Sequence, residues 1–212
     1  MAIPETFTST SSTDSSTPPT SRQRIVDIAR RLFIEEGYLG VSMQQIADVS
    51  GLRKASLYHH FRSKDSLFAD VMAQLMDRLL LEFATDDLTG APIEEQLRQI
   101  ALINYHQFDQ PEISRLAQDF FKHVPESEHT EVHERLRSMQ GVFSEIFERA
   151  IERGELVPIN PHYAATMFFH MMMALAHQEP EFATVPPPPA DEAASLVVQV
   201  LLHGLSGKST QQ

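Results

Sequence analysis

A short segment near the N-terminus brings cationic and hydroxyl side chains together at helical spacing. Residues 43–62 read MQQIADVSGLRKASLYHHFR, and Gly51 divides them into two short helical pieces, since glycine readily adopts the positive φ of a sharp turn. In the second piece, Leu52, Leu57 and Phe61 share an inner face. The outer face carries Arg53, Lys54, Ser56, His59 and His60. Such a helix suits the major groove of B-DNA, where base edges offer acceptors to cationic side chains.

The first piece is expected to bury Ile46, Ala47 and Val49, and the small Ala47 allows two helices to cross closely. A small residue, a glycine four positions later and then spaced aliphatic residues are typical of a helix-turn-helix. A plain helical hairpin with a solvated basic face is the alternative that this segment alone leaves open.

Charge is distributed unevenly along the chain. The 212 residues carry a net charge of -12, which argues against binding of nucleic acid over the whole surface. Residues 21–64 nevertheless hold eight Lys and Arg against four acidic residues, whereas residues 65–212 hold nine against 23. A small basic module joined to a larger acidic one indicates contact with nucleic acid through one end.

Composition and motifs exclude several classes of protein. Cysteine is absent, which excludes a disulfide framework, thiol catalysis and thiolate metal sites. No apolar run reaches the roughly 18 residues that a membrane span needs, and no secretory signal opens the chain, so we expect a cytoplasmic protein. GLSGKST at 204–210 has Leu202 where a phosphate-binding loop requires glycine, and no G-x-S-x-G or H-E-x-x-H occurs. We therefore expect neither an enzyme nor a cofactor.

Two of the ten histidines have the spacing of metal ligands. His129 and His133 lie four residues apart, so one helix face could carry both. Three glutamates around them, Glu128, Glu131 and Glu134, indicate a solvated polar face instead. We expect no metal site.

Apolar residues at positions i, i+3, i+4 and i+7 recur along the chain and predict an all-α protein of about nine helices. The first helix is expected to end at Gly37, and Ser63 is expected to cap the helix after the two short pieces. Residues 1–20 include a run rich in Ser and Thr and predict a disordered tail, and residues 207–212 form a second tail.

Residues 21–81 closely resemble the DNA-binding domain of the tetracycline-repressor (TetR/AcrR) family of transcriptional regulators. The residues that carry this resemblance are Ile25, Ala29, Leu32, Phe33, Gly37-Tyr38, Val41-Ser42, Ile46-Ala47, Gly51, Leu57-Tyr58, His60-Phe61, Ser63-Lys64 and Leu67. Beyond residue 81 the resemblance is general, and it rests on the count and order of helices and on the closing pattern at 201–205.

The resemblance implies a division of the chain into two domains. The N-terminal three-helix DNA-binding domain with its helix-turn-helix covers 21–66, within a family module to about 81 that includes the connecting helix from Ser63. The C-terminal helical domain over 82–206 would bind a ligand and dimerise. A homodimer would carry two recognition helices about 34 Å apart, which suits a palindromic operator in double-stranded DNA.

The resemblance also assigns roles to nine residues at the DNA. Ser42 would hold a phosphate at the start of the second helix, and Gln44 would reach a base or a phosphate. Base edges would be read by Arg53, Lys54, Ser56 and His59. Phosphates would be anchored by Tyr58, His60 and Lys64. The sequence leaves open which of Arg53 and Lys54 reads a base.

In the C-terminal domain, the last two helices of the family usually form the dimer interface. Here the candidate residues are Met167, Phe168, Met171, Leu175, Val197, Val200 and Leu201. A pocket for a small hydrophobic effector would be lined by Met76, Tyr105, Phe108, Phe120, Phe121, Met139, Phe143 and Phe147. An ordinary helical core is the alternative for both sets, and aromatic and Met side chains at helical spacing more often belong to such a core.

The function we expect is that of a ligand-responsive repressor, released from its operator by the effector. Two alternatives remain from the sequence. One is a regulator whose ligand promotes DNA binding. The other is a helical small-molecule carrier or enzyme that does not bind DNA.

Overall fold

The computed structural model describes residues 20–85, 90–108, 111–176, 186 and 188–203. The two tails expected at the chain ends lie outside these residues, except for Thr20. The described part confirms the all-α prediction, because it contains nine α-helices, one 3₁₀ turn and no strand. The helices are α1 (Ser21–Gly40), α2 (Met43–Ser50), α3 (Lys54–His60), α4 (Lys64–Thr85), α5 (Ile93–Phe108), α6 (Pro111–His123), η1 (Glu126–Glu128), α7 (Thr130–Glu152), α8 (Pro161–Ala176) and α9 (Ala190–His203). None of these described helices combines the length and the apolar character that crossing a bilayer would require.

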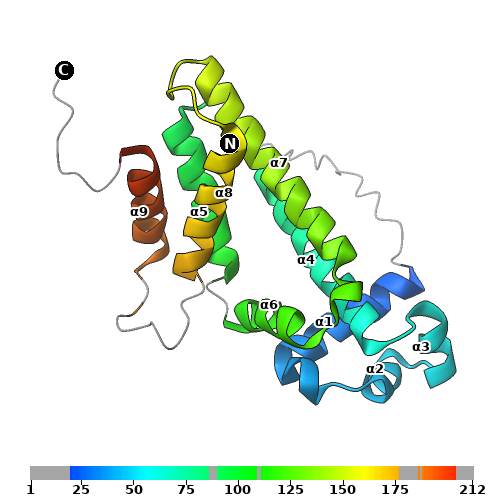
Figure 1. The fold of residues 1–212 in the computed structure, drawn as a ribbon. Helices are drawn as coiled ribbons and strands as arrows, with labels where there is room; N and C mark the ends of the chain where they lie inside the picture. Colours follow the sequence, from blue (N-terminus) through cyan, green and yellow to red (C-terminus); the bar gives the residue numbers. More distant parts are fainter. Residues whose placement is uncertain (1–19, 86–89, 109–110, 177–185, 187, 204–212) are drawn as a thin grey trace, which may run out of the picture.

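The helices form two groups at opposite ends of the molecule (Figure 1). The helices α1, α2 and α3 lie at one end, and α5, α8 and α9 lie at the other. The long helices α4 and α7 pack against each other and run between the two groups, and α6 lies close to α1. A movement of α4 or α6 would therefore be transmitted directly to α1, which both helices contact.

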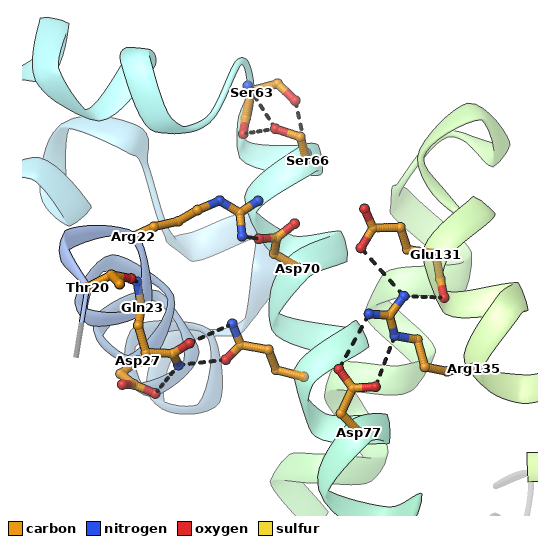
Figure 2. Close-up of polar contacts among 11 residues, drawn as sticks. Thr20, Arg22, Gln23, Asp27, Ser63, Ser66, Asp70, Asp77, Glu131 and Arg135 are labelled. Carbon is orange, nitrogen blue, oxygen red and sulfur yellow. Dashed lines mark hydrogen bonds and ion pairs between the residues drawn. The ribbon is translucent and has the colours of Figure 1, made fainter. Parts of the chain in front are cut away.

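Local signals in the sequence set the ends of the N-terminal helices. Gly37 adopts a φ of 73° and interrupts α1, which resumes for a short turn up to Gly40. Gly51 ends α2 in the left-handed conformation (φ 68°), and its N–H donates to the carbonyl of Asp48 at 3.1 Å. Ser63 caps α4 as predicted, because its Oγ accepts a hydrogen bond from the N–H of Ser66 at 3.0 Å (Figure 2).

The apolar core crosses the boundary expected between the two domains. One cluster of buried side chains joins α1–α4 to α6 and to the start of α7. At its centre the Phe68 ring lies 4.6 Å from Phe33, 5.0 Å from Tyr38 and 5.7 Å from Phe120, measured between ring centroids. The second cluster joins the end of α4 to α5, α7, α8 and α9. The prediction that Val49 is buried is wrong, since its side chain is 52% exposed on the outer side of α2.

Polar contacts tie α4 to its neighbours on both sides (Figure 2). On the side of α1, Arg22 forms an ion pair with Asp70, and the amide of Gln23 donates to that of Gln74 at 2.8 Å. On the side of α7, the Arg135 guanidinium meets both oxygens of Asp77, with the shorter contact at 3.1 Å. This contact raises the pKa of Arg135, chiefly through the hydrogen bond from the guanidinium to Asp77. The register of α4 against both neighbours is thus fixed by side-chain pairs as well as by packing.

The start of α5 depends on a carboxylate from a distant loop. Glu155 accepts a hydrogen bond from the N–H of Ile93 at 2.6 Å, and this contact lowers the pKa of Glu155. Because the folded-state pKa lies below the unfolded value, the contact stabilises the fold at neutral pH and is lost as the pH falls through the folded pKa. We expect Glu155→Ala to lower the free energy of unfolding by about 1 kcal/mol at pH 7.

Urea unfolding at pH 7 and at pH 3 would check this expectation. The difference between Glu155→Ala and wild type should shrink at pH 3, while the control Glu148→Ala, an exposed carboxylate on α7, should match wild type at pH 7. An equal loss at both pH values would contradict the assignment of a charged cap.

Candidate nucleic-acid interface and ligand cavity

The second helix of the helix-turn-helix, α3, turns its apolar side chains inward and its polar side chains outward. Leu57 is fully buried and Phe61 nearly so, and both belong to the core beneath α1 and α4. The opposite face exposes Arg53, Lys54, Tyr58, His59 and His60, with Ser56 half-buried beside them. Within the described chain, neither Arg53 nor Lys54 forms an ion pair, so both charges face solvent.

The start of α2 contributes a second exposed group of hydrogen-bonding atoms. The Oγ of Ser42 accepts from the N–H of Gln45 at 3.2 Å and so caps the helix, which leaves its hydroxyl proton free to donate. The side chain of Gln44 is exposed and donates to Asp48 at 2.8 Å, a contact within α2 that must open before Gln44 reaches a partner. Helices α2 and α3 are in contact and lie at the same end of the molecule (Figure 1).

Lys64 is placed differently from the other candidate DNA contacts. Its ammonium donates to the carbonyls of Tyr38 at 2.8 Å and Val41 at 3.0 Å and lies 4.0 Å from the centre of the Tyr38 ring. Burial lowers the pKa of Lys64, and the neighbouring Asp65 opposes that effect. Two of the three ammonium protons therefore hold the connection between α1 and α2, and one remains for a phosphate.

Two family models match this chain. "Bacterial regulatory proteins, tetR family" matches residues 25–71, which hold the helix-turn-helix, and "Tetracyclin repressor-like, C-terminal domain" matches residues 90–177. The chain belongs to the TetR family. The resemblance seen in the sequence is thereby confirmed, and it extends into the C-terminal domain of this TetR-family protein.

Among relatives of this TetR-family chain is the HTH-type transcriptional repressor KstR2 of Rhodococcus jostii. It is 28% identical over 134 residues, which are 63% of this chain and 64% of KstR2. The HTH-type transcriptional repressor AcnR of Corynebacterium glutamicum is 39% identical over 51 residues, 24% of this chain and 27% of AcnR. The matched part of the chain thus spans less than two thirds of the length of these relatives.

Solved structures of the TetR type share the fold. The fatty acid degradation regulator FadR of Bacillus halodurans superposes with a TM-score of 0.73 at 17% identity, over 91% of this chain and 99% of FadR. AibR in complex with isovaleryl coenzyme A and operator DNA superposes with a TM-score of 0.62 at 24% identity, over 86% and 98%. FadR of Bacillus subtilis in complex with stearoyl-CoA superposes with a TM-score of 0.66 at 18% identity, over 86% and 98%.

Helix α6 of the C-terminal domain makes polar contacts with the DNA-binding domain. Asp119 accepts a hydrogen bond from the N–H of Tyr38 at 3.0 Å, and Arg115 donates to the carbonyl of Ile34. The ring of His123 stacks on that of Tyr38, with 5.9 Å between their centroids. A second tie joins Arg62, next to α3, to both carboxylate oxygens of Glu128 in η1, at 2.7 and 2.9 Å.

On its other side, α6 borders a largely apolar cavity of about 430 Å³. Its lining residues are Met76, Leu79, Asn104, Ala117, Gln118, Phe121, Leu136, Met139, Phe169 and Met173. A volume of this size lies in the usual range of small-molecule sites. One helix thus contacts both the cavity and α1.

Three of the predicted pocket residues, Met76, Phe121 and Met139, line this cavity. The others occupy different places. Tyr105, Phe120, Phe143 and Phe147 are buried in the two core clusters and do not line it, because each packs toward neighbouring helices. The side chain of Phe108 lies outside the described part of the structure.

The predicted dimer residues also divide into two sets. Met167 is 52% exposed, and Met171, Leu175, Val200 and Leu201 are half-buried along α8 and α9. Phe168 and Val197 are buried in the chain's own core and expose almost no surface to a second subunit. Tyr163, one helical turn before Met167 on α8, and Leu196 on α9 are further exposed apolar side chains of these two helices.

The histidine pair at the start of α7 has a structural role. His129 is buried, contrary to the solvated face expected, and its Nε2 lies 2.9 Å from the carbonyl oxygen of Val124. Its ring packs 4.7 Å from Phe120, and His133 remains exposed. Across the described residues, no three His, Asp or Glu side chains come together as ligands of a metal.

Several functional candidates were missed in the sequence. On α5 the apolar stripe of Ile93, Leu97, Ile100 and Ala101 is followed by the polar Asn104. This polar residue in an apolar stripe was the sequence signal that could have predicted a hydrogen-bonding group in the cavity wall. Phe169 and Met173 lie one helical turn apart on α8, but the spacing alone does not separate cavity lining from core. No local pattern identifies Asp119, because its partner lies 81 residues away.

Proposed function

We propose that this TetR-family protein is a DNA-binding transcriptional regulator that acts as a repressor. The observation that carries the proposal is the exposed face of α3, which presents Arg53 and Lys54 above the buried Leu57. Guanidinium and ammonium groups on a groove-sized helix match the acceptors of guanine in the major groove. The relatives named as repressors, KstR2 and AcnR, favour repression over activation. The work of such a regulator needs no catalytic group and is done in the bacterial cytoplasm.

The second part of the proposal is a homodimer formed by α8 and α9. Their outer faces carry exposed apolar side chains, among them Tyr163, Met167 and Leu196. An apolar surface spread over two adjacent helices is typical of an interface between subunits. A two-fold axis there would set two α3 helices to read a palindromic operator.

The third part is control of DNA binding by a small hydrophobic effector in the cavity beside α6. Ala117, Gln118 and Phe121 of α6 border the cavity, while Asp119 and Arg115 of the same helix hold α1. An effector that displaces α6 would move α1 and change the distance between the two α3 helices of a dimer. Acyl thioesters of coenzyme A are the first effectors to test, since two neighbours in fold were solved with isovaleryl coenzyme A and stearoyl-CoA.

A reporter gene fused to the DNA upstream of the chain's own gene tests repression. Removal of the protein should raise expression several-fold, and its return should restore the low level. A version with Arg53→Ala and Lys54→Ala should fail to restore it. A fall in expression on removal would identify an activator, and an unchanged level would contradict regulation of this gene.

Asp119→Ala tests the route through α6. Loss of the acceptor for the Tyr38 N–H should weaken the coupling of the two domains, which in allosteric proteins amounts to about 1–3 kcal/mol. In mobility-shift titrations with and without stearoyl-CoA, the ratio of the two dissociation constants for DNA should fall toward one. Glu148→Ala, which removes an exposed carboxylate from α7, should keep the wild-type ratio, and a full response in Asp119→Ala would contradict the route.

A further inference from the structure

Asn104 is a polar side chain that the fold buries. It lies on α5, is 2% exposed and lines the cavity beside α6. No described residue forms a hydrogen bond with its Oδ1. Around it the cavity wall is apolar except for Gln118, which is exposed on α6, and no lining side chain is ionisable.

Such a group is unusual in a folded protein. A buried amide oxygen that loses its water without gaining a donor lowers the stability of the fold, and most buried polar groups are therefore paired. Leucine or methionine in place of Asn104 would avoid this loss of stability and would resemble the apolar side chains of the surrounding cavity wall. Asn104 belongs to the wall of the cavity, so a rotation of its side chain would present the amide to a bound molecule that supplies the missing partner.

We propose that the effector places one uncharged hydrogen-bonding group against Asn104 and fills the rest of the cavity with apolar surface. The inference rests on the proposed function, in which this cavity is the effector site. The primary amide offers both an acceptor and two donors, so a hydroxyl, a ketone, an amide or a thioester carbonyl would satisfy it.

A charged group fits this position poorly. Burying a carboxylate or an ammonium is unfavourable unless an opposite charge or several hydrogen bonds compensate it. The described cavity wall offers no opposite charge. Asn104 thus selects neutral molecules, such as an ester or thioester, over the corresponding free acid.

Calorimetric titration of the full-length protein with three matched probes tests this inference. Butylbenzene is apolar, 4-butylphenol adds one hydroxyl group, and 4-butylbenzoate adds a negative charge at pH 7.5. Wild type should bind the phenol about tenfold more tightly than butylbenzene, in line with one net hydrogen bond in a buried site. It should bind the benzoate at least about tenfold more weakly than the phenol.

Two variants separate a role in recognition from a role in folding. Asn104→Leu and Asn104→Ala should both lose the preference for the phenol, whereas Glu148→Ala, an exposed position on α7 outside the cavity lining, should keep it. Asn104→Leu should also raise the Tm of the unliganded protein by about 3–6 °C, because an unpaired polar group is replaced by an apolar one.

Three outcomes would overturn the inference. They are an unchanged phenol preference in the Asn104 variants, binding of the benzoate as tight as that of the phenol, and no binding of any probe by wild type. A mobility shift of the same wild-type preparation on DNA separates these failures from failure of the proposed function. If the protein still binds DNA, only the inference about Asn104 falls.

Discussion

Replacement of Arg53 and Lys54 by alanine in one variant is expected to lower the affinity for operator DNA by about 1,000-fold or more. Each side chain is exposed on α3 and would meet a base edge or a phosphate. A well-formed contact of this kind contributes about 1–3 kcal/mol, and about 1.4 kcal/mol corresponds to tenfold in affinity. A dimer would lose four such contacts. Mobility-shift titration at fixed salt concentration measures the change.

The control is a variant with the same loss of charge at a different place. Lys122→Ala and Arg137→Ala remove two exposed cations from α6 and α7. Their combined effect on DNA affinity should stay within about threefold of wild type, since charges far from the duplex are largely screened. Equal losses in the two double variants would mean that net charge, rather than the face of α3, governs binding.

Phe68→Ala is expected to destabilise the protein by about 3–5 kcal/mol, the range observed for truncation of a buried aromatic side chain. Phe68 is fully buried and contacts the rings of Phe33, Tyr38 and Phe120. The cavity left behind would loosen α4 from both α1 and α6. Urea unfolding followed by circular dichroism gives the free energy.

Phe121→Ala provides the comparison for Phe68→Ala. The Phe121 ring is 48% exposed at the border of the cavity, so its removal should cost less than half as much. A loss below about 1 kcal/mol for Phe68→Ala would contradict the assignment of these four rings as the core shared by the two domains.

Residues that act through local backbone chemistry could be predicted from the sequence. Gly51 ends α2 with a positive φ and Ser63 caps α4, because both effects depend only on neighbouring residues. The exposed face of α3 followed from the spacing of Leu57 and Phe61. The prediction that Val49 is buried was wrong because the apolar periodicity of an eight-residue helix is compatible with more than one buried face.

Side chains whose role depends on distant helices could not be assigned in the same way. Phe143, Phe147 and Phe168 pack against one another across α7 and α8, while Met76 and Met139 border a cavity. Apolar type and helical spacing are the same for both groups. Only the packing of α4, α5, α6, α7 and α8 decides which apolar side chains enclose an empty volume.

Lys64 combines a predicted contact with a phosphate and a structural contact within the protein, and the sequence does not distinguish the two. The family pattern marks it as a phosphate anchor, and the structure places its ammonium on the carbonyls of Tyr38 and Val41. Such a contact fixes the turn between α1 and α2 whether or not DNA is bound. The phosphate role stays a prediction, which rests on the one ammonium proton that these carbonyls leave free.

A mobility-shift titration of the wild-type protein on the DNA upstream of its own gene, at 50 and 200 mM salt, tests the central claim most directly. The account predicts binding that is tighter than to unrelated DNA of equal length and that weakens at least tenfold at the higher salt concentration, because the cationic side chains at the start of α3, Arg53 and Lys54, displace counterions from phosphates. Failure to shift any DNA, even at 50 mM salt, would contradict the account.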